Sequence, residues 1–373
     1  MIAGEPSGDH HAAALARELR ARRPDLRLIG TGGPHMQDAG VELLAGLDDL
    51  SVMGFVEVLP RIPYFRKLAA RLHRIMDEDP PALVVLIDYP GFNLRMARSA
   101  HGRGIPVLYY IAPQVWAWKQ RRARTMAEIT DRVAVILPFE PEFLGRFGVK
   151  ATYVGHPLID RSDDVPDRPT FLAEYGLPAD RPLLGLLPGS RQQELRRHLE
   201  PFRAIAARVV ESRPDVLPVF SRAASLHAGP FHDLGFPVVD DTRALQRHAT
   251  AALVKSGTST LETALEGTPF AIGYRTSPIT AALARRLVKT DHIGLPNLIA
   301  GERVAPEFFQ DELTPDEVAP VLLDLLAEDS RARQKQQEGL RRVRERLGDP
   351  GAAARVAEIA EELLGAGSPG TVA

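Results

Sequence analysis

Three stretches of this sequence place glycine and hydroxyl residues directly after an apolar run and directly before a helical pattern. They are Gly189-Ser190-Arg191, Ser256-Gly257-Thr258 and the segment from Gly4 to Asp9. A strand that leads into the start of a helix presents free backbone N–H groups, and such groups bind anions. Each stretch is therefore a candidate ligand-binding loop.

The two stretches in the second half of the chain favour a nucleotide diphosphate. Arg191 adds a planar guanidinium suited to phosphate oxygens. Glu262 could accept hydrogen bonds from a ribose diol, as carboxylates do in nucleotide-binding α/β domains. A structural alternative stays open at both places, because Ser190 with Gln193, and Ser259 with Glu262, also fit ordinary capping boxes.

The stretch near the N-terminus differs in charge from the other two. Glu5 and Asp9 lie beside Ser7 and Gly8, and two acids argue against a phosphate as the direct ligand. They favour sugar hydroxyls or an amine. Neither the G-x-G-x-x-G fingerprint nor Walker A spacing occurs, which argues against a nicotinamide enzyme and a P-loop ATPase.

Asp88 is the candidate general base. It ends the apolar run at 82–88, and a carboxylate at the carboxyl end of a central strand faces the ligand-binding side of the sheet. Partial burial there would raise its pKa toward a useful value. The alternative is that Asp88 caps the following helix. No metal site is expected, because His156 and the histidines at 10–11 lack companions at metal-ligand spacing.

A basic amphipathic helix is predicted at 61–76. Apolar residues recur there at helical spacing, and five basic residues intervene without an acid. This pattern suits the surface of an anionic membrane. A helix packed on the core with a solvated basic face fits the pattern equally well. The residues assigned to membrane docking are Phe65, Arg66, Lys67, Leu68, Arg71 and Leu72.

Two doubly wound parallel sheets must position these residues. Short β-branched runs alternate with longer helical patterns, which is typical of parallel strands buried on both faces. The first series of predicted strands lies at 26–30, 82–88, 105–111, 132–138 and 151–155, and a Pro- and Asp-rich linker at 160–182 follows. The second series lies at 182–189, 216–221, 236–241, 251–257 and 269–274.

Length and composition limit the remaining classes. The chain has 373 residues, 45% hydrophobic and 25% charged, which predicts a packed protein of two domains. A net charge of -2 argues against a dedicated nucleic-acid binder. The absence of cysteine excludes disulfides, thiol nucleophiles and zinc-thiolate sites. No apolar run long enough to span a bilayer and no secretory signal occur, so we expect a cytoplasmic protein.

Motifs along nearly the whole chain resemble those of the lipid-A-disaccharide synthase family. In order, they are AGEPSGD at 3–9, VMGFVEVLP at 52–60, IDYPGFN at 87–93, APQVWAW at 112–118, LPFE at 137–140, VGHPLID at 154–160, LPGSRQQE at 187–194, SGTSTLE at 256–262 and LPNLIAG at 295–301. One departure concerns the first strand. Only two residues precede Ala3, so we expect either an upstream start or a truncated strand.

The resemblance implies an α/β GT-B fold, with two Rossmann-like domains facing across a cleft. The expected domains are 1–165, joined by a C-terminal helix at 350–365 that crosses back, and 166–348. The implied reaction is inverting transfer from UDP-2,3-diacylglucosamine to 2,3-diacylglucosamine 1-phosphate. It gives UDP and a β-1',6-linked lipid A disaccharide 1-phosphate.

The resemblance also assigns roles to the candidate residues. Asp88 would be the catalytic base, and the sugar nucleotide would be a substrate, with no cofactor and no metal. The acceptor side would comprise Gly4, Glu5, Ser7, Gly8, Asp9, Met53 and Asn93. The donor would be bound by Gly189, Ser190, Arg191, Ser256, Gly257, Thr258, Glu262, Asn297 and Gln310.

Acylated substrates imply a place of action as well. An enzyme that uses them would be peripheral on the cytosolic face of the inner membrane, with the inner leaflet as its partner surface and no nucleic acid. The helix at 61–76 then becomes the expected docking surface. A homo-oligomer stays open. Two alternatives also stay open: another GT-B enzyme acting on UDP-N-acetylglucosamine, or a nucleotide-sugar-binding protein without catalysis.

Overall fold

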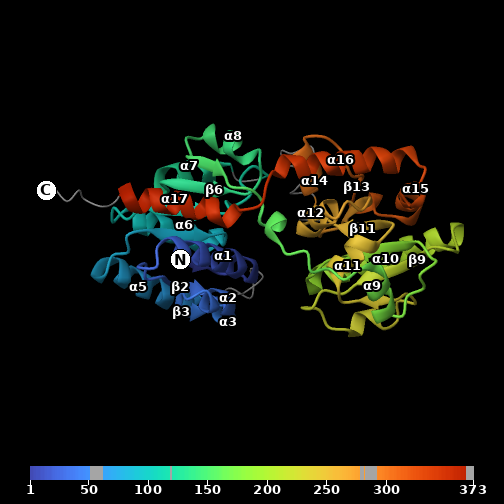
Figure 1. The fold of residues 1–373 in the computed structure, drawn as a ribbon, viewed down its shortest axis with the longest axis horizontal. Coiled ribbons are helices and arrows are strands. Elements are labelled where there is room, and N and C mark those ends of the chain that lie inside the picture. The colour runs from blue at the N-terminus through green and yellow to red at the C-terminus, as the bar shows by residue number, and fades with distance from the viewer. Residues whose placement is uncertain (51–61, 118–119, 278–280, 282–291, 367–373) are drawn as a thin grey trace. The chain divides into compact units, whose positions relative to one another are not determined.

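The computed structural model describes residues 1–50, 62–117, 120–277, 281 and 292–366 (Figure 1). The chain forms two compact units. The first unit comprises Met1–Asp160 and the chain from Asp349 onward, and the second comprises Arg161–Gly348. The chain therefore enters the second unit at Arg161 and returns to the first at Asp349.

A seven-stranded parallel sheet forms the centre of the first unit, in the order β3-β2-β1-β4-β5-β6-β7. β1 lies between β2 and β4, and Ile2 pairs with Thr31 on one side and with Leu86 on the other. The strands are β1 (Ile2–Ala3), β2 (Ile29–Gly32), β3 (Glu42–Gly46), β4 (Val84–Ile87), β5 (Val107–Tyr110), β6 (Arg132–Val135) and β7 (Ala151–Tyr153).

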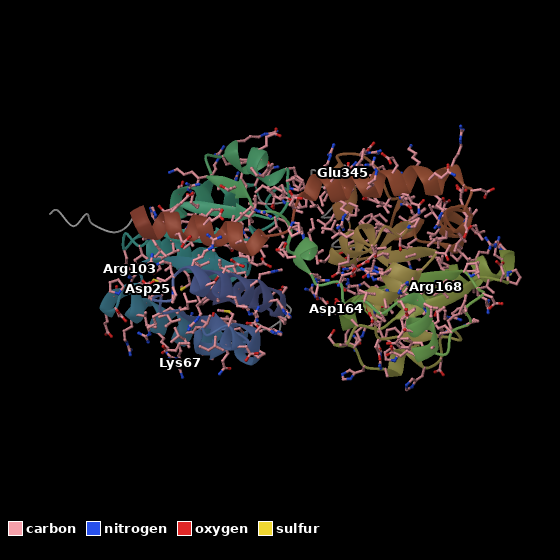
Figure 2. The ribbon with its side chains drawn as sticks, in the orientation of Figure 1. Asp25, Lys67, Arg103, Asp164, Arg168 and Glu345 are labelled. Carbon is pink, nitrogen blue, oxygen red and sulfur yellow. The ribbon has the colours of Figure 1, made fainter. Side chains whose placement is uncertain are left out.

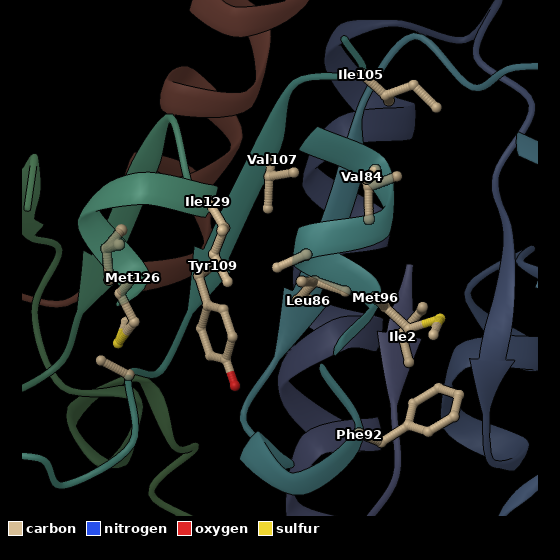
Figure 3. Close-up of a cluster of buried hydrophobic side chains, with 14 of the residues drawn as sticks. Ile2, Val84, Leu86, Phe92, Met96, Ile105, Val107, Tyr109, Met126 and Ile129 are labelled. Atoms are coloured by element: carbon tan, nitrogen blue, oxygen red, sulfur yellow. The ribbon is translucent and has the colours of Figure 1, made fainter. Parts of the chain in front are cut away.

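Alternate residues of these strands point into two separate apolar cores, because successive side chains of a strand face opposite sides of the sheet. Leu86 and Tyr109 belong to one core, part of which Figure 3 shows, and Ile87 and Tyr110 belong to the other. Helices that cover the first core are α5 (Ile62–Glu78), α6 (Pro90–His101), α7 (Arg121–Ile129) and α8 (Glu140–Gly145).

The second core of this unit is covered by helices from both ends of the chain. They are α1 (Pro6–Arg22), α2 (Pro34–Asp38) and α17 (Ala352–Ala366). α17 packs beside α1, and the Arg22 guanidinium lies 3.1 Å from the Glu358 carboxylate. Short segments complete the unit: α3 (Leu47–Leu50) and the 3-10 helix η2 (Pro157–Asp160).

The second unit contains a six-stranded parallel sheet in the order β10-β9-β8-β11-β12-β13. Its strands are β8 (Leu183–Leu187), β9 (Leu217–Ser221), β10 (Val238–Val239), β11 (Ala251–Lys255), β12 (Phe270–Tyr274) and β13 (Glu307–Phe309). α10 (Gln192–Ser212) and α15 (Pro315–Leu326) cover one face. The other elements are α9 (Arg168–Glu174), α11 (Thr242–His248), α12 (Thr258–Leu265), α14 (Leu295–Ala300), α16 (Arg331–Leu347), η3 (Gly229–Phe231) and η4 (Gln310–Glu312).

The prediction of two parallel-sheet units is confirmed, and the errors concern the edge strands β3 and β13 and the bounds of β2. β3 and β13 were not predicted, because both are edge strands without a continuous buried run. The strand expected at 26–30 begins at Ile29 instead and continues through Gly30-Thr31-Gly32. Its glycine-rich sequence lacks the side chains by which a strand is recognised.

The strand order of each sheet reverses at one point, and the candidate loops lie there. In the first sheet the reversal falls between β1 and β4, which lead into Gly4 and Asp88. In the second it falls between β8 and β11, which lead into Gly189 and Ser256. Ligands of open α/β sheets bind outside the carboxyl ends of the strands at this switch point.

Candidate active site

Asp88 lies directly after β4 in a strained backbone conformation that several hydrogen bonds maintain. Its φ is 46° and that of Tyr89 is 48°, a left-handed region that costs a non-glycine residue about 1 kcal/mol or more. The Asp88 carbonyl accepts hydrogen bonds from the Tyr109 hydroxyl at 2.7 Å and from the Asn93 amide at 2.8 Å. The alternative role as a helix cap is not observed, because Tyr89 is the N-cap of α6 and no side chain caps that helix.

The surroundings of Asp88 raise its pKa to about 6. Burial is the main cause, and the negative charge of Glu5 adds to it, while the Tyr89 N–H acts in the opposite direction. The expected rise in pKa is thus confirmed. A carboxyl group with a pKa near 6 is a usable general base at neutral pH.

The other N-terminal residues differ in their access to a ligand. Ser7 is exposed at the start of α1, and Glu5 is its half-buried N-cap. Gly4 leaves room for the Tyr89 ring, since a Cβ at Gly4 would lie 2.5 Å from it. Gly8 is buried where α1 meets the sheet at Ala3. Met53 lies outside the described residues.

Asp9 and Asn93, predicted on the acceptor side, both make hydrogen bonds within the protein. The Asp9 carboxylate is 1% exposed and accepts the N–H groups of Gly33, His35 and Met36 at the start of α2. Asn93 is fully buried, and its amide donates to carbonyls of the chain, including that of Asp88. Asn93 therefore positions Asp88 through its amide nitrogen, and its Oδ1 has no hydrogen-bond partner in the described chain. Sequence spacing alone could not distinguish these roles, because burial depends on the packing of distant elements.

In the second unit, the backbone of the Gly189-Ser190 loop binds a carboxylate of the protein itself, that of Glu194. Gly189 has a φ of 120°, which favours glycine, and the Ser190 N–H donates to the Glu194 carboxylate at 3.1 Å. The helix starts at Gln192 with Arg191 as its N-cap, so the capping box of Ser190 is not formed. The Arg191 side chain is exposed and has no ion pair within 4.0 Å in the described part of the chain.

Lys255, which the sequence did not single out, completes this arrangement. Its ammonium lies 2.7 Å from the Glu194 carboxylate, and both side chains are mostly buried. Burial tends to raise the pKa of Glu194, but the hydrogen bond and charge of Lys255, the Ser190 N–H and the charge of Arg191 together lower that pKa. A Cβ at Gly257 would lie 3.5 Å from the ammonium, so Lys255 reaches both candidate loops. A single lysine at the end of a strand gives no sequence signal for such a role.

The Ser256-Gly257-Thr258 loop leads into α12 without a side-chain cap. Gly257 is the N-cap of that helix, with a φ of 152°, and Thr258 is exposed. The predicted capping-box alternative with Ser259 is therefore absent. The Glu262 carboxylate instead lies 2.7 Å from the Arg161 guanidinium and is 19% exposed.

Asn297 and Gln310, predicted to bind the donor, are engaged by the protein backbone. Asn297 is fully buried, and its amide group makes hydrogen bonds with Val304, Ala305 and Glu307 that occupy both its donors and its acceptor. Gln310 has a left-handed φ of 56° and makes two hydrogen bonds to the backbone of Thr276. Both residues therefore shape loops near the carboxyl ends of strands, and Asn297 has no surface to offer a ligand.

His198 links the Glu194 region to the end of β12 as a neutral imidazole. Its Nε2 accepts the N–H of Arg275 at 2.9 Å, so its Nδ1 must donate to the carbonyl of Glu194 at 2.7 Å. Burial lowers the pKa of His198 to about 4. A fixed neutral tautomer keeps α10, and with it Glu194, in place across the physiological pH range.

The helix predicted for membrane docking has its apolar face turned inward. Leu68 and Leu72 are buried in the first core, and Phe65 packs 6.0 Å from the Phe92 ring, so these three residues do not form an exposed docking face. The core-packed alternative is thus the one observed. Arg66, Lys67 and Arg71 are exposed, and Figure 2 shows Lys67 at the surface. The exposed basic face follows from helical periodicity, whereas the burial of its opposite face required the tertiary structure.

The described residues contain neither a cluster of metal ligands nor a membrane-spanning helix. Among the residues that the structure describes, no three His, Cys, Asp or Glu side chains gather as metal ligands would. None of the helices in that part of the chain has the length and hydropathy that a bilayer crossing requires.

The chain matches, over residues 1–362, the sequence profile of a family described as lipid-A-disaccharide synthetase. Two relatives are named lipid-A-disaccharide synthase. The protein of Geobacter sulfurreducens is 41% identical over 372 residues, which cover 98% of this chain and 97% of the relative. That of Anaeromyxobacter sp. (strain K) is 42% identical over 373 residues, covering 98% and 96%.

Solved structures with low sequence identity share the fold. A glycosyltransferase of kitacinnamycin has a TM-score of 0.64 at 17% identity, with 98% of each chain covered. Acinetobacter baumannii MurG has a TM-score of 0.56 at 14% identity, covering 97% of this chain and 98% of that one. With the two parallel sheets, these similarities establish the GT-B fold.

Proposed function

We propose specific substrates for this chain, which belongs to the lipid-A-disaccharide synthase family and is therefore a UDP-sugar glycosyltransferase of lipid A biosynthesis. The donor is UDP-2,3-diacylglucosamine and the acceptor is 2,3-diacylglucosamine 1-phosphate. The products are UDP and a β-1',6-linked disaccharide 1-phosphate. The main support is Asp88, a half-buried carboxyl group with a pKa of about 6 at the switch point of the first sheet.

The proposed reaction is a single inverting displacement. The acceptor hydroxyl attacks the anomeric carbon of the donor, and its proton passes to the Asp88 carboxylate. The bond between the anomeric carbon and the diphosphate oxygen breaks, and UDP leaves with the bonding electrons. Asn93 and Tyr109 support this step by holding the backbone of Asp88 in its strained conformation.

Positive charge in the second unit would stabilise the departing diphosphate. Arg191 is exposed and has no carboxylate partner in the described part of the chain, so its guanidinium is available for phosphate oxygens. The phosphates would displace Glu194 from the Ser190 N–H and from Lys255, and so gain both donors. Preorganised donors of this kind are worth about 10²- to 10³-fold in rate. No resident cofactor takes part in the proposed step.

We also propose that the chain works at the cytosolic face of the inner membrane, where acylated substrates reside. The support is the exposed basic face of α5, including Arg66 and Lys67, because each basic residue near an anionic surface contributes about 1 kcal/mol. A double variant, R66Q/K67Q, should bind vesicles containing anionic lipid roughly 30-fold more weakly in a sedimentation assay. The matched control is R95Q/R98Q, which removes two exposed charges from α6. Equal effects of the two variants would argue against docking through α5.

The substrate assignment is tested by turnover. The purified chain, incubated in detergent with both acylated sugars, should release UDP and form the disaccharide. The comparison assay replaces the donor by UDP-N-acetylglucosamine, which should react poorly. Faster reaction with the non-acylated sugar would favour another GT-B activity. UDP binding without turnover of either donor would favour a non-catalytic binding protein.

A further inference from the structure

A cavity of about 300 Å³ in the first unit lies beside the proposed base. Such a volume is at the lower end for a small-molecule site and is sufficient for a sugar. The cavity lies at the carboxyl ends of β4 and β5, on the ligand-binding side of the sheet. Its lining residues are Asp88, Pro90, Ile111, Ala112, Pro113, Gln114, Val115 and Arg122.

The backbone around this cavity is strained at two lining residues. Asp88 has a φ of 46° and Ile111, a β-branched residue, has a φ of 64°. Left-handed backbone is rare for any β-branched side chain, and such strain persists only where the surrounding structure imposes it. The loops after two neighbouring strands are thus both held in costly conformations at one cavity. This concentration of strain points to a binding site.

Arg122 gives the cavity a positive charge that forms no ion pair in the described chain. It is the second residue of α7 and is half-buried, and no carboxylate of the described chain lies within ion-pair distance of it. The first turn of α7 contains no acidic residue. Arg103 and Arg132, by contrast, are paired with Asp77 and Glu362. An arginine that lines a cavity and forms no ion pair is suited to an anionic ligand.

The position of Asp88 in the same cavity restricts the form of that ligand. A free anion filling the cavity would meet the Asp88 carboxylate and be repelled by it. A molecule with a phosphate at one end and a hydroxyl at the other avoids this repulsion, because the phosphate can pair with Arg122 while the hydroxyl faces Asp88. Gln114, which lines the cavity and is exposed, can hydrogen-bond to either sugar or phosphate oxygens.

We infer that this cavity binds the sugar phosphate of the acceptor, with Arg122 as the residue that recognises its phosphate group. The inference rests on the proposed function and extends it, since it places the acceptor phosphate on a named residue. Arg122 is thereby a specificity-determining residue. It selects the phosphorylated acceptor and orients its hydroxyl toward Asp88.

The first experiment compares two acceptors, 2,3-diacylglucosamine 1-phosphate and the same sugar without phosphate. R122Q should lower kcat/KM for the phosphorylated acceptor about 10- to 100-fold, mainly through KM, because charged hydrogen bonds of this kind contribute 1.5–3 kcal/mol. Its kcat/KM for the other acceptor should not change. R122K should retain part of the preference. The matched control is R121Q, which removes an exposed charge from the preceding position of the same helix and should behave as wild type.

The second experiment separates this inference from the proposed function, because it does not depend on turnover. Ligand-observed NMR titrations would compare glucosamine 1-phosphate with glucosamine, and UDP would serve as a second anion. R122Q should lose the preference for glucosamine 1-phosphate while its UDP affinity stays that of the wild type. Failure of the wild type to turn over either acceptor would count against the proposed function alone.

Three results would overturn the role of Arg122. One is an equal loss for both acceptors in R122Q, which would indicate a purely structural residue. Another is an unchanged preference for the phosphorylated sugar in either experiment. The third is a loss of UDP affinity in R122Q, which would assign the guanidinium to the donor. A thermal unfolding curve of R122Q that matches wild type ensures that these results report on binding.

Discussion

The two units carry opposite charges at the switch points of their sheets. In the first unit, the acids Glu5 and Asp88 lie close together, whereas in the second unit the basic residues Arg191 and Lys255 lie at the switch point. The two sheets share one strand order around this point. The backbone therefore decides where a ligand binds, and the loop side chains decide which charge it meets. Partial burial and the negative charge of Glu5 raise the pKa of Asp88 to about 6, while the cations of the second unit are suited to an anionic ligand.

The two units also differ in whether a charged side chain has a partner of opposite charge within the protein. Asp88 has no cationic partner among the causes of its pKa shift, and its burial raises that pKa. Lys255 is neutralised by Glu194, which also occupies the Ser190 N–H. In the first unit, burial thus destabilises the charged form of Asp88. In the second unit, the Glu194 carboxylate occupies donors that the anion of a ligand could use.

The largest expected effect comes from removing the base. D88N should lower kcat about 10³-fold or more, within the usual contribution of general acid–base catalysis, and should leave UDP affinity unchanged. Steady-state assays and calorimetric titration with UDP would measure the two quantities. If D88N lost UDP affinity as well, the separation of roles between the units would be wrong.

Removing the exposed guanidinium of Arg191 should weaken donor binding and leave the base unchanged. R191A should lower kcat/KM for the donor about 10²- to 10³-fold and weaken UDP binding. The pH profile of the residual activity of R191A should still show the ionisation of Asp88, because the first unit is unchanged. R196A, which removes an exposed charge from the same helix, is the matched control and should be close to wild type.

The pH dependence of activity and of stability should run in opposite directions. Because the base must be deprotonated, kcat should fall about tenfold per pH unit below about 6. The folded-state pKa of Asp88 exceeds the ordinary value of 3.8, so its contribution to stability is present at low pH and is lost as the pH rises through about 6. The free energy of unfolding of D88N should therefore be higher than that of wild type by on the order of 2 kcal/mol at pH 8. Below pH 4 the two free energies of unfolding should be equal. Denaturant titrations at several pH values would check this, and a D88N variant less stable at pH 8 would contradict it.

A smaller effect is expected at the internal ion pair of the second unit. K255M leaves the Glu194 carboxylate partly buried without its partner and should destabilise the chain by about 1–2 kcal/mol. The double variant K255M/E194Q should recover stability but should still bind UDP more weakly than wild type. Full recovery of UDP affinity would show that Lys255 serves only to neutralise Glu194.

The smallest predicted effect concerns Asp9, whose role in the first unit is structural. D9N should destabilise the chain by about 1 kcal/mol, because the charged acceptor of three N–H groups is lost, and it should leave KM for the acceptor unchanged. The matched control is D38N, at the exposed end of α2, the helix whose first N–H groups Asp9 accepts. If KM for the acceptor rose in D9N but not in D38N, Asp9 would contribute to acceptor binding, contrary to this prediction.

Local patterns predicted the parts of the site that follow directly from strands. Asp88 and the loops at Gly189 and Ser256 were found because a buried run precedes each of them, and parallel strands end on one side of a sheet. The roles of Asn93 and Asn297 were not found, since both side chains are buried against segments distant in sequence. Leu68 and Leu72 fitted a docking face by periodicity, which cannot tell whether an apolar face meets lipid or a core.

Local patterns in the chain were enough to predict two doubly wound sheets and the residues of their loops, because hydrophobic periodicity and turn residues act over a few positions. The contacts of those loop residues became clear only from the packing of the folded chain. It brought Lys255 to Glu194 and left Arg122 at the cavity beside Asp88 without a carboxylate partner in the described chain. Contacts of this kind join residues far apart in sequence, so their charge and burial are fixed by packing and not by local pattern.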